Sequence, residues 1–156
     1  MKKVLKAMLR FVPMLAVMVI IYWFSAMEGD ESTDTSGLFL RAIAKIAESL
    51  SKHELSNDAL GAMHLIIRKC AHFSEYAVLG ISTMYAFNQI IGSRLFLIIL
   101  SEILSFLYAC TDEWHQYHVP GRFGTFSDVL IDSAGAITGI LLAFFIFRAF
   151  RGKRLK

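Results

Sequence analysis

The sequence predicts an all-α membrane protein, in which four transmembrane helices form a bundle and one short amphipathic helix lies outside the membrane. Apolar residues make up 56% of the 156 residues, and the mean hydropathy of +0.54 is high for a soluble domain. The apolar residues are concentrated in long runs, and lysines and arginines cluster at both ends of the chain. A chain of this length is expected to form one domain, covering residues 1–156.

The first apolar run, residues 11–27, carries no charge and ends in the aromatic cluster Tyr22-Trp23-Phe24. Aromatic residues of this kind are typical of the membrane–water interface. The basic residues before the run also fit a cleavable signal peptide, but residues 24–27 make a poor cleavage site. We therefore interpret the run as a retained span.

Residues 28–58 are polar and mostly acidic. We expect a loop over residues 28–37, and Thr35 or Ser36 as the cap of a helix that ends near Ser51. This helix is too short and too charged to cross a membrane, so it lies either at the membrane surface or packed on the bundle. Its apolar residues share one face: Phe39, Ile43, Ile46, Ala47 and Leu50.

Three more spans are expected after this segment. A helix begins near Asn57 or Asp58, both favourable caps, and becomes a span over residues 70–91. The third span covers residues 95–111, with Glu102 at its middle, and the fourth covers residues 127–147. The distribution of basic residues places both termini in the cytoplasm, and the turn formed by Pro120-Gly121 on the outer side.

Polar side chains are expected to meet at the outer ends of the last three spans. The second and fourth spans run inward and the third runs outward, so their polar clusters lie on one side of the membrane and at one depth. The clusters are His72 and Glu75 on the second span, Asp112, Glu113 and His115 after the third, and Asp128 and Asp132 on the fourth.

The fourth span carries a stripe of spaced small and acidic residues. Asp128, Asp132, Gly135 and Gly139 fall on one helical face, so the carboxylates should face the bundle. The two glycines allow close packing on a neighbouring helix, which lies either within the bundle or, in a homodimer, in a second copy of the chain.

Two interpretations of the polar cluster follow from its residue types. In the first, Lys69 and Arg122 hold a phosphate while a carboxylate–histidine pair moves protons. In the second, the cluster is a buried network that joins the helices, with Arg122 paired to Asp128 or Asp132 and His72 paired to Glu113. The candidate catalytic residues are His72, Glu75, Glu113 and Asp128, and the candidate substrate-binding residues are Lys69, Tyr76, His115, Gln116, Arg122 and Asp132.

Other kinds of site are less well supported by the sequence. No HExxH or other strict metal spacing occurs, so a divalent cation bound by His72, Glu75, Glu113 and the aspartates is an alternative that the sequence does not favour, and the cofactor stays unassigned. Cys70 and Cys110 are interpreted as apolar fillers. The absence of a basic stripe interleaved with aromatic residues argues against a nucleic-acid partner.

Two long motifs occur within residues 57–142. The first is Arg68-Lys69-Cys70-Ala71-His72-Phe73-Ser74-Glu75-Tyr76, followed by Leu79-Gly80, and the second is Asp112-Glu113-Trp114-His115-Gln116, followed by Pro120-Gly121-Arg122. Together with Asp128 and the series Asp132, Gly135 and Gly139, these motifs resemble those of the VanZ-like family of bacterial integral membrane proteins. In that family an asparagine often stands at the position of Asp132.

This resemblance implies a multi-pass protein of the bacterial cell membrane, linked to susceptibility to the glycopeptide antibiotic teicoplanin. It implies no particular reaction, so whether the chain is an enzyme stays open. We expect the outward-facing polar site to act on or bind a membrane lipid or a lipid-linked envelope precursor. The alternatives are a non-enzymatic scaffold or regulatory module, and a small transporter or flippase that needs Glu102 at mid-span.

Overall fold

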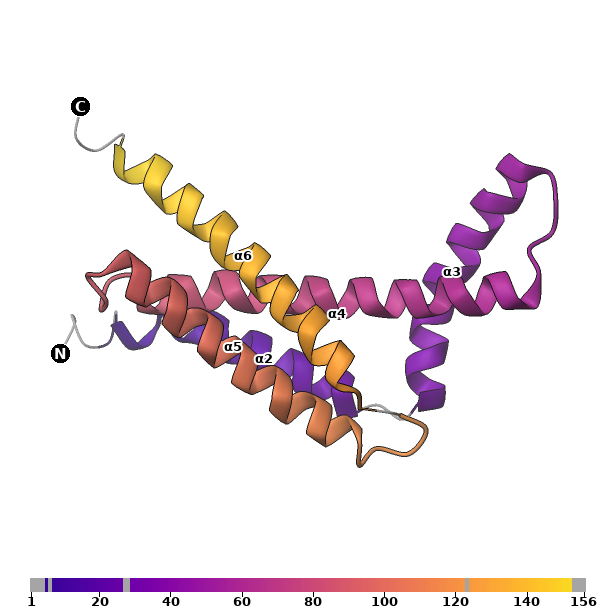
Figure 1. Ribbon diagram of the computed structural model, residues 1–156, viewed down its shortest axis with the longest axis horizontal. Coiled ribbons are helices and arrows are strands. Elements are labelled where there is room, and N and C mark those ends of the chain that lie inside the picture. Colours follow the sequence, from indigo (N-terminus) through magenta and orange to yellow (C-terminus); the bar gives the residue numbers. More distant parts are fainter. Residues whose placement is uncertain (1–4, 6, 27–28, 123, 153–156) are drawn as a thin grey trace.

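The computed structural model describes residues 5, 7–26, 29–122 and 124–152, and Figure 1 shows their arrangement. Within these residues the chain is helical and has no strand, which confirms the all-α prediction. The helices are α2 (Val12–Ala26), α3 (Gly29–Ser51), α4 (Asn57–Phe87), α5 (Arg94–Gln116) and α6 (Phe126–Gly152).

Two of the described helices are long and apolar enough to cross a membrane, α5 over Arg94–Gln116 and α6 over Phe126–Phe150. Helix α2 is equally apolar but has 15 residues, and α4 has 31 residues with a polar N-terminal half. The structure therefore supports two full-length spans and one shorter apolar helix, where the sequence predicted four spans. Large apolar side chains of α5 and α6 face outward, as expected for a surface in contact with lipid.

Helix α3 begins at Gly29, so the loop predicted for residues 28–37 is wrong within the described residues, and Glu28 lies outside them. Thr35 and Ser36 lie inside the helix rather than at its cap. The segment has several acidic residues just after Gly29, and negative charge near a helix N-terminus is favourable because it interacts with the helix dipole. The loop prediction gave this effect no weight.

The apolar face of α3 is largely uncovered. Ala44 is buried, while Ile43, Ile46 and Leu50 are exposed. Helix α3 crosses the N-terminal half of α4, far from the N-terminus of the chain (Figure 1). Helix α3 is therefore not packed fully on the bundle, and its place at a membrane surface stays a prediction.

The ends of α4 and α5 differ from the predicted ends by up to five residues. Ser56, not Asn57 or Asp58, caps α4, and its hydroxyl accepts a hydrogen bond of 3.2 Å from the Ala59 N–H. Helix α4 ends at Phe87, before the predicted end at residue 91. Helix α5 continues to Gln116, so the polar residues expected to follow the third span form its last turns.

Helices α4 and α6 pack against each other at three glycines. A Cβ atom at Gly135, Gly139 or Gly80 would overlap a backbone carbonyl oxygen of the other helix. Gly135 meets Phe73 and Gly139 meets Ala77, so residue numbers rise together and the two helices run in the same direction (Figure 1). The glycine stripe is therefore occupied within one chain, and a homodimer through it stays a prediction.

The remaining helices complete the bundle around α4 and α6. Arg10 lies over the ring of Tyr85, at 4.6 Å, which places the start of α2 beside the end of α4. The Tyr108 hydroxyl donates a hydrogen bond of 2.5 Å to the Met18 carbonyl and so joins α5 to α2. One core cluster contains residues of α2, α4, α5 and α6: Ile21, Tyr76, Leu79, Ala109, Val129 and Ala136.

Candidate functional site

Polar side chains are buried where the ends of α2 and α5 meet the start of α6 and the middle of α4. They come from three helices and from the turn at Gly121, whose φ of 73° suits glycine. His72 and Glu75 are half-buried in the same region. The fully buried members are Asp112, Glu113, Gln116, Arg122 and Asp132.

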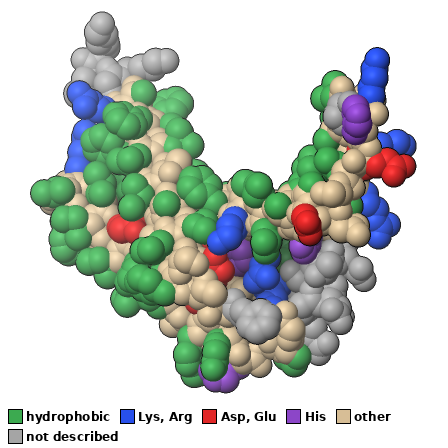
Figure 2. Space-filling view, turned by 45° about the vertical axis from the view of Figure 1, so that its right-hand side comes forward, with side chains coloured by type: hydrophobic (Ala, Val, Ile, Leu, Met, Phe, Trp, Pro, Cys, Tyr) green, Lys and Arg blue, Asp and Glu red, His purple; other side chains and the backbone are tan. Residues whose placement is uncertain are grey.

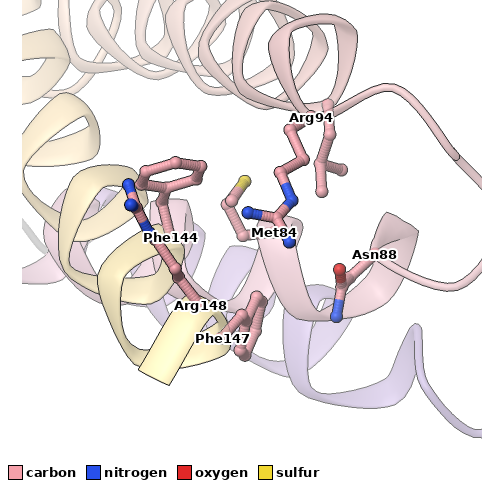
Figure 3. A pocket seen from close by; sticks show the side chains of 7 residues that line it. Met84, Asn88, Arg94, Phe144, Phe147 and Arg148 are labelled. Carbon is pink, nitrogen blue, oxygen red and sulfur yellow. The ribbon is translucent and has the colours of Figure 1, made fainter. Parts of the chain in front are cut away.

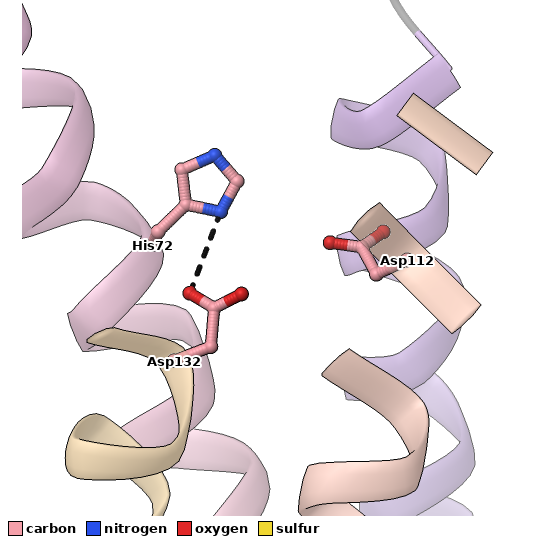
Figure 4. A group of neighbouring side chains, drawn as sticks. All are labelled: His72, Asp112 and Asp132. Carbon is pink, nitrogen blue, oxygen red and sulfur yellow. Dashed lines mark ion pairs between the residues drawn. The ribbon is translucent and has the colours of Figure 1, made fainter. Parts of the chain in front are cut away.

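His72 faces Asp132, not Glu113, so the predicted pairing of His72 with Glu113 is wrong. The distance from His72 Nδ1 to Asp132 Oδ1 is 3.7 Å, and the two side chains are 15% and 0% exposed. Figure 4 shows the pair, with Asp112 approaching from α5. The contact between Gly135 and Phe73 explains this partner, because it brings the preceding turn of α6 against α4.

Gln116 links α4 to α5 and is fully buried. Its side-chain amide donates a hydrogen bond of 3.2 Å to Asp112 Oδ2, and its carbonyl accepts one of 3.3 Å from Arg68 Nη2. The Ser25 and Tyr76 hydroxyls also lie near the Asp112 carboxylate. Asp112 therefore has neighbours on α2, α4 and α5, and Gln116 on its own helix donates a hydrogen bond to it.

Glu113 anchors the connection between α5 and α6. Its Oε2 accepts a hydrogen bond of 2.9 Å from the N–H of Thr125, the residue before α6 begins. A Cβ atom at Gly124 would overlap the Glu113 carbonyl oxygen, so the connection passes directly over the end of α5. Glu113 Oε1 is buried and has no hydrogen-bond partner among the described residues.

Arg122 does not pair with Asp128 or Asp132 as predicted. Its Nη2 donates a hydrogen bond of 2.8 Å to the Phe24 carbonyl, at the end of α2. Burial lowers the pKa of Arg122 and nearby Arg68 lowers it further, while carboxylates, Asp112 foremost, act in the opposite direction. The guanidinium therefore joins the C-terminal end of α2 to the cluster.

Asp128 and Lys69 form an ion pair at the rim of the site. The distance from Lys69 Nζ to Asp128 Oδ1 is 2.7 Å, and the side chains are 45% and 21% exposed. Both residues line a cavity of about 260 Å³ between α4 and α6. Figure 2 shows charged and histidine side chains gathered in a hollow of the surface. The full lining is Leu65, Arg68, Lys69, His72, Thr125, Ser127, Asp128, Ile131 and Asp132.

His115 and Tyr76 stand apart from this cavity. The His115 ring stacks on Tyr22 of α2, with ring centroids 4.8 Å apart. Tyr76 is completely buried in the core cluster, where its ring lies 6.3 Å from that of Tyr108. Glu75 is near Asp112 and Arg122 without lining the cavity.

Two residues outside the predicted candidate set belong to the site. Arg68 lines the cavity and donates a hydrogen bond to the Gln116 side chain. Asp112 accepts a hydrogen bond from the Gln116 side chain. The spacing of four residues between Asp112 and Gln116, and between Arg68 and His72, was a signal that could have found them.

A second, small pocket of about 20 Å³ lies at the opposite end of the bundle. Figure 3 shows Arg94 and Arg148 beside Asn88, with Phe144 and Phe147 completing one wall. No residue of the predicted candidate set lines it.

Comparison with protein families gives one match, to the family described as VanZ/LLP1, over residues 11–148. Neither the curated proteins nor the solved structures give a match. The matched region includes α2 through most of α6 and so contains the whole polar site. The apolar helices and this match together show that the chain is a membrane protein and belongs to the VanZ/LLP1 family.

Proposed function

We propose that this chain is a multi-pass protein of the bacterial cell membrane whose outward-facing site binds the phosphate-bearing head group of a lipid or lipid-linked envelope precursor. The cavity between α4 and α6 carries the proposal. Its volume of about 260 Å³ suits a head group better than a whole lipid. Its lining combines the cations of Arg68 and Lys69 with the apolar side chains of Leu65 and Ile131.

The two cations are available in different ways. Arg68 uses Nη2 for Gln116, and a guanidinium has further N–H donors that match the oxygens of a phosphate. Lys69 is half-exposed, and its ion pair with Asp128 lies at the rim, where a surface pair contributes little stability. A phosphate can therefore replace Asp128 as the partner of Lys69 at low cost.

The orientation is supported by where the arginines lie. Arg94 and Arg148 (Figure 3) are at the end of the bundle opposite the cavity. Arg10 lies beside Tyr85, near the same end. Basic residues favour the cytoplasmic side, so both termini belong there and the cavity faces outward. The exposed rings of Trp114 and Tyr117 at the site end suit the outer interface.

We further propose that α2 and the second half of α4 cross the membrane beside α5 and α6. Helix α2 packs with α5 and α6 in one core cluster, and the second half of α4 packs with them in both clusters. The exposed apolar face of α3 then lies on the outer membrane surface. This arrangement gives four spans, and the family resemblance links the chain to teicoplanin susceptibility.

The test is head-group binding by the purified full chain in dodecyl maltoside micelles, which carry no phosphate, with a short-chain prenyl phosphate as the probe. Arg68→Gln and Lys69→Gln should each weaken binding at least tenfold, because a hydrogen bond to a charged group contributes about 1.5–3 kcal/mol. Lys45→Gln, which changes an exposed lysine of α3, should bind like wild type. Equal affinity in all four proteins contradicts the proposal.

A second candidate function is a non-enzymatic module that stabilises a partner. It is favoured by the hydrogen bonds of Glu113, Gln116 and Arg122, which all tie one part of the chain to another. A transporter is less well supported. Glu102 lines a separate cavity of about 250 Å³, between α5 and α6, whose other lining residues are isoleucine and leucine.

A further inference from the structure

Three helices bring one imidazole and two carboxylates together beneath the cavity. The ligand atoms of His72, Asp112 and Asp132 all lie within 4.8 Å of one another. Figure 4 shows the Asp112 carboxylate reaching from α5 toward the His72–Asp132 pair. Imidazole nitrogen and carboxylate oxygen are the donors that divalent transition metals such as Zn²⁺ and Mn²⁺ take in proteins.

Asp132 lacks the partners that its burial requires. Its side chain is 0% exposed, and neither carboxylate oxygen has a hydrogen-bond partner among the described residues. His72 Nδ1 is also buried and unpartnered, since 3.7 Å is too long for a hydrogen bond. A carboxylate without partners is costly to bury, so these unpartnered atoms point to a ligand between them.

The formal charges around the triad, counted with every carboxyl group ionised, leave a negative excess. Lys69 pairs with Asp128, so these two cancel. Four carboxylates remain, and they face two guanidiniums. Within the described chain, the hydrogen bond of Arg68 goes to Gln116 and that of Arg122 goes to the Phe24 carbonyl, so neither goes to a carboxylate. The carboxylates are Glu75, Asp112, Glu113 and Asp132, and the guanidiniums are Arg68 and Arg122. One divalent cation supplies the two missing positive charges.

The geometry needs only a small adjustment. Metal–ligand distances of about 2.1 Å place the ligands of a tetrahedral ion about 3.4 Å apart. The present separations of up to 4.8 Å close by small rotations of the carboxylates. His72 and Asp132 also line the cavity, so a fourth coordination position would open toward it.

We propose that His72, Asp112 and Asp132 bind a divalent transition-metal cation at the floor of the cavity. The site goes beyond the head-group proposal and does not depend on it. In the bound state the cation satisfies the unpartnered oxygens of Asp132 and presents its open position to the cavity.

The test uses the purified full chain in nanodiscs, treated with a chelator and then titrated with Zn²⁺, Mn²⁺ or Co²⁺. Calorimetry and elemental analysis should give one cation per chain, and Co²⁺ should show the visible absorption of a nitrogen- and oxygen-ligated ion. His72→Ala, Asp112→Asn and Asp132→Ala should each weaken binding at least tenfold. Glu102→Gln, which changes a carboxylate of α5 outside the triad, should bind like wild type.

Two further measurements keep the outcome decisive. In the wild type, Zn²⁺ should slow the modification of His72 by diethylpyrocarbonate, read by mass spectrometry, and should not slow that of His118. This measurement needs no variant, so its result does not depend on whether a variant folds. Lys69→Gln should keep cation binding and lose head-group affinity, which separates failure of one proposal from failure of the other. Absence of stoichiometric binding, or wild-type affinity in the His72→Ala/Asp132→Ala double variant, overturns the cation site.

Discussion

At the scale of single residues, the site depends on a few buried polar groups whose partners lie on other helices. Gln116 is the clearest case, since its one side chain contacts both Arg68 and Asp112. The sequence placed Gln116 in the candidate set because of its position in a polar cluster. It did not indicate these partners, because they depend on how α4 and α5 pack.

Gln116→Leu should destabilise the protein by about 1–3 kcal/mol, because it removes one hydrogen bond each from the buried Asp112 and the half-buried Arg68. Thermal unfolding in detergent, followed by circular dichroism, measures the effect. Gln89→Leu, at an exposed position between α4 and α5, is the matched control and should leave the midpoint nearly unchanged. A midpoint for Gln116→Leu equal to that of the control would show that the bridge is unimportant.

Glu113→Gln should keep both the fold and head-group binding, because the amide oxygen can still accept the hydrogen bond from Thr125. Glu113→Ala loses this acceptor and should be less stable by about 1–3 kcal/mol. The two variants are compared in the unfolding and binding assays. Loss of binding in a folded Glu113→Gln protein would instead assign the carboxylate a direct part in the activity.

At the scale of secondary-structure elements, the interface of α4 and α6 positions the site. The contacts of Gly135 with Phe73 and of Gly139 with Ala77 leave no room for a side chain between the helices. This packing sets the register that brings Asp132 to His72 and Asp128 to Lys69.

Gly139→Ala should destabilise the protein by about 1–3 kcal/mol, because the added methyl group forces α4 and α6 apart. Gly61→Ala is the control, since nothing lies within 4 Å of the position that its methyl group would take and alanine favours a helix more than glycine does. Unfolding midpoints of both variants test the prediction. The interface would not be tight if Gly139→Ala were as stable as Gly61→Ala.

The sequence predicted most of these elements and the clustering of their polar ends. Apolar runs indicated α2, α5 and α6, and the spacing of Gly135 and Gly139 indicated a contact stripe. The start of α3 was missed because Thr35 and Ser36 are residue types that often cap helices, and the sequence does not show that here they lie inside one. Ion-pair partners were missed too, since helical periodicity gives the face of a residue but not the register of the opposite helix.

At the scale of the whole molecule, Arg94 and Arg148 line a small pocket at one end of the bundle, and the polar cavity lies toward the other end. This polarity predicts the orientation in the membrane. The background for the test is a chain with Cys70 and Cys110 replaced by alanine. In whole cells a membrane-impermeant maleimide should label a cysteine placed at His118 and not one placed at Ser93. The reverse labelling would place the cavity in the cytoplasm.

Expression in a teicoplanin-sensitive host tests whether the cavity contributes to the proposed link with teicoplanin susceptibility. Wild type should reduce susceptibility, and Lys69→Gln should lose most of this protection at equal membrane levels, because the cavity loses a cation that holds the head group. Lys45→Gln should protect like wild type. Equal protection by all three proteins would separate the phenotype from the cavity.

The parallel packing of α4 and α6 also bears on how the protein is made. Lys69 and Asp128 are 59 residues apart in the chain, and α5 lies between their helices. At about 5–20 residues per second, the ribosome needs several seconds to make this stretch. During that time the polar half of α4 has emerged without its partners on α6. The site is therefore assembled last, because the polar half of α4 stays without its α6 partners until α6 has been made.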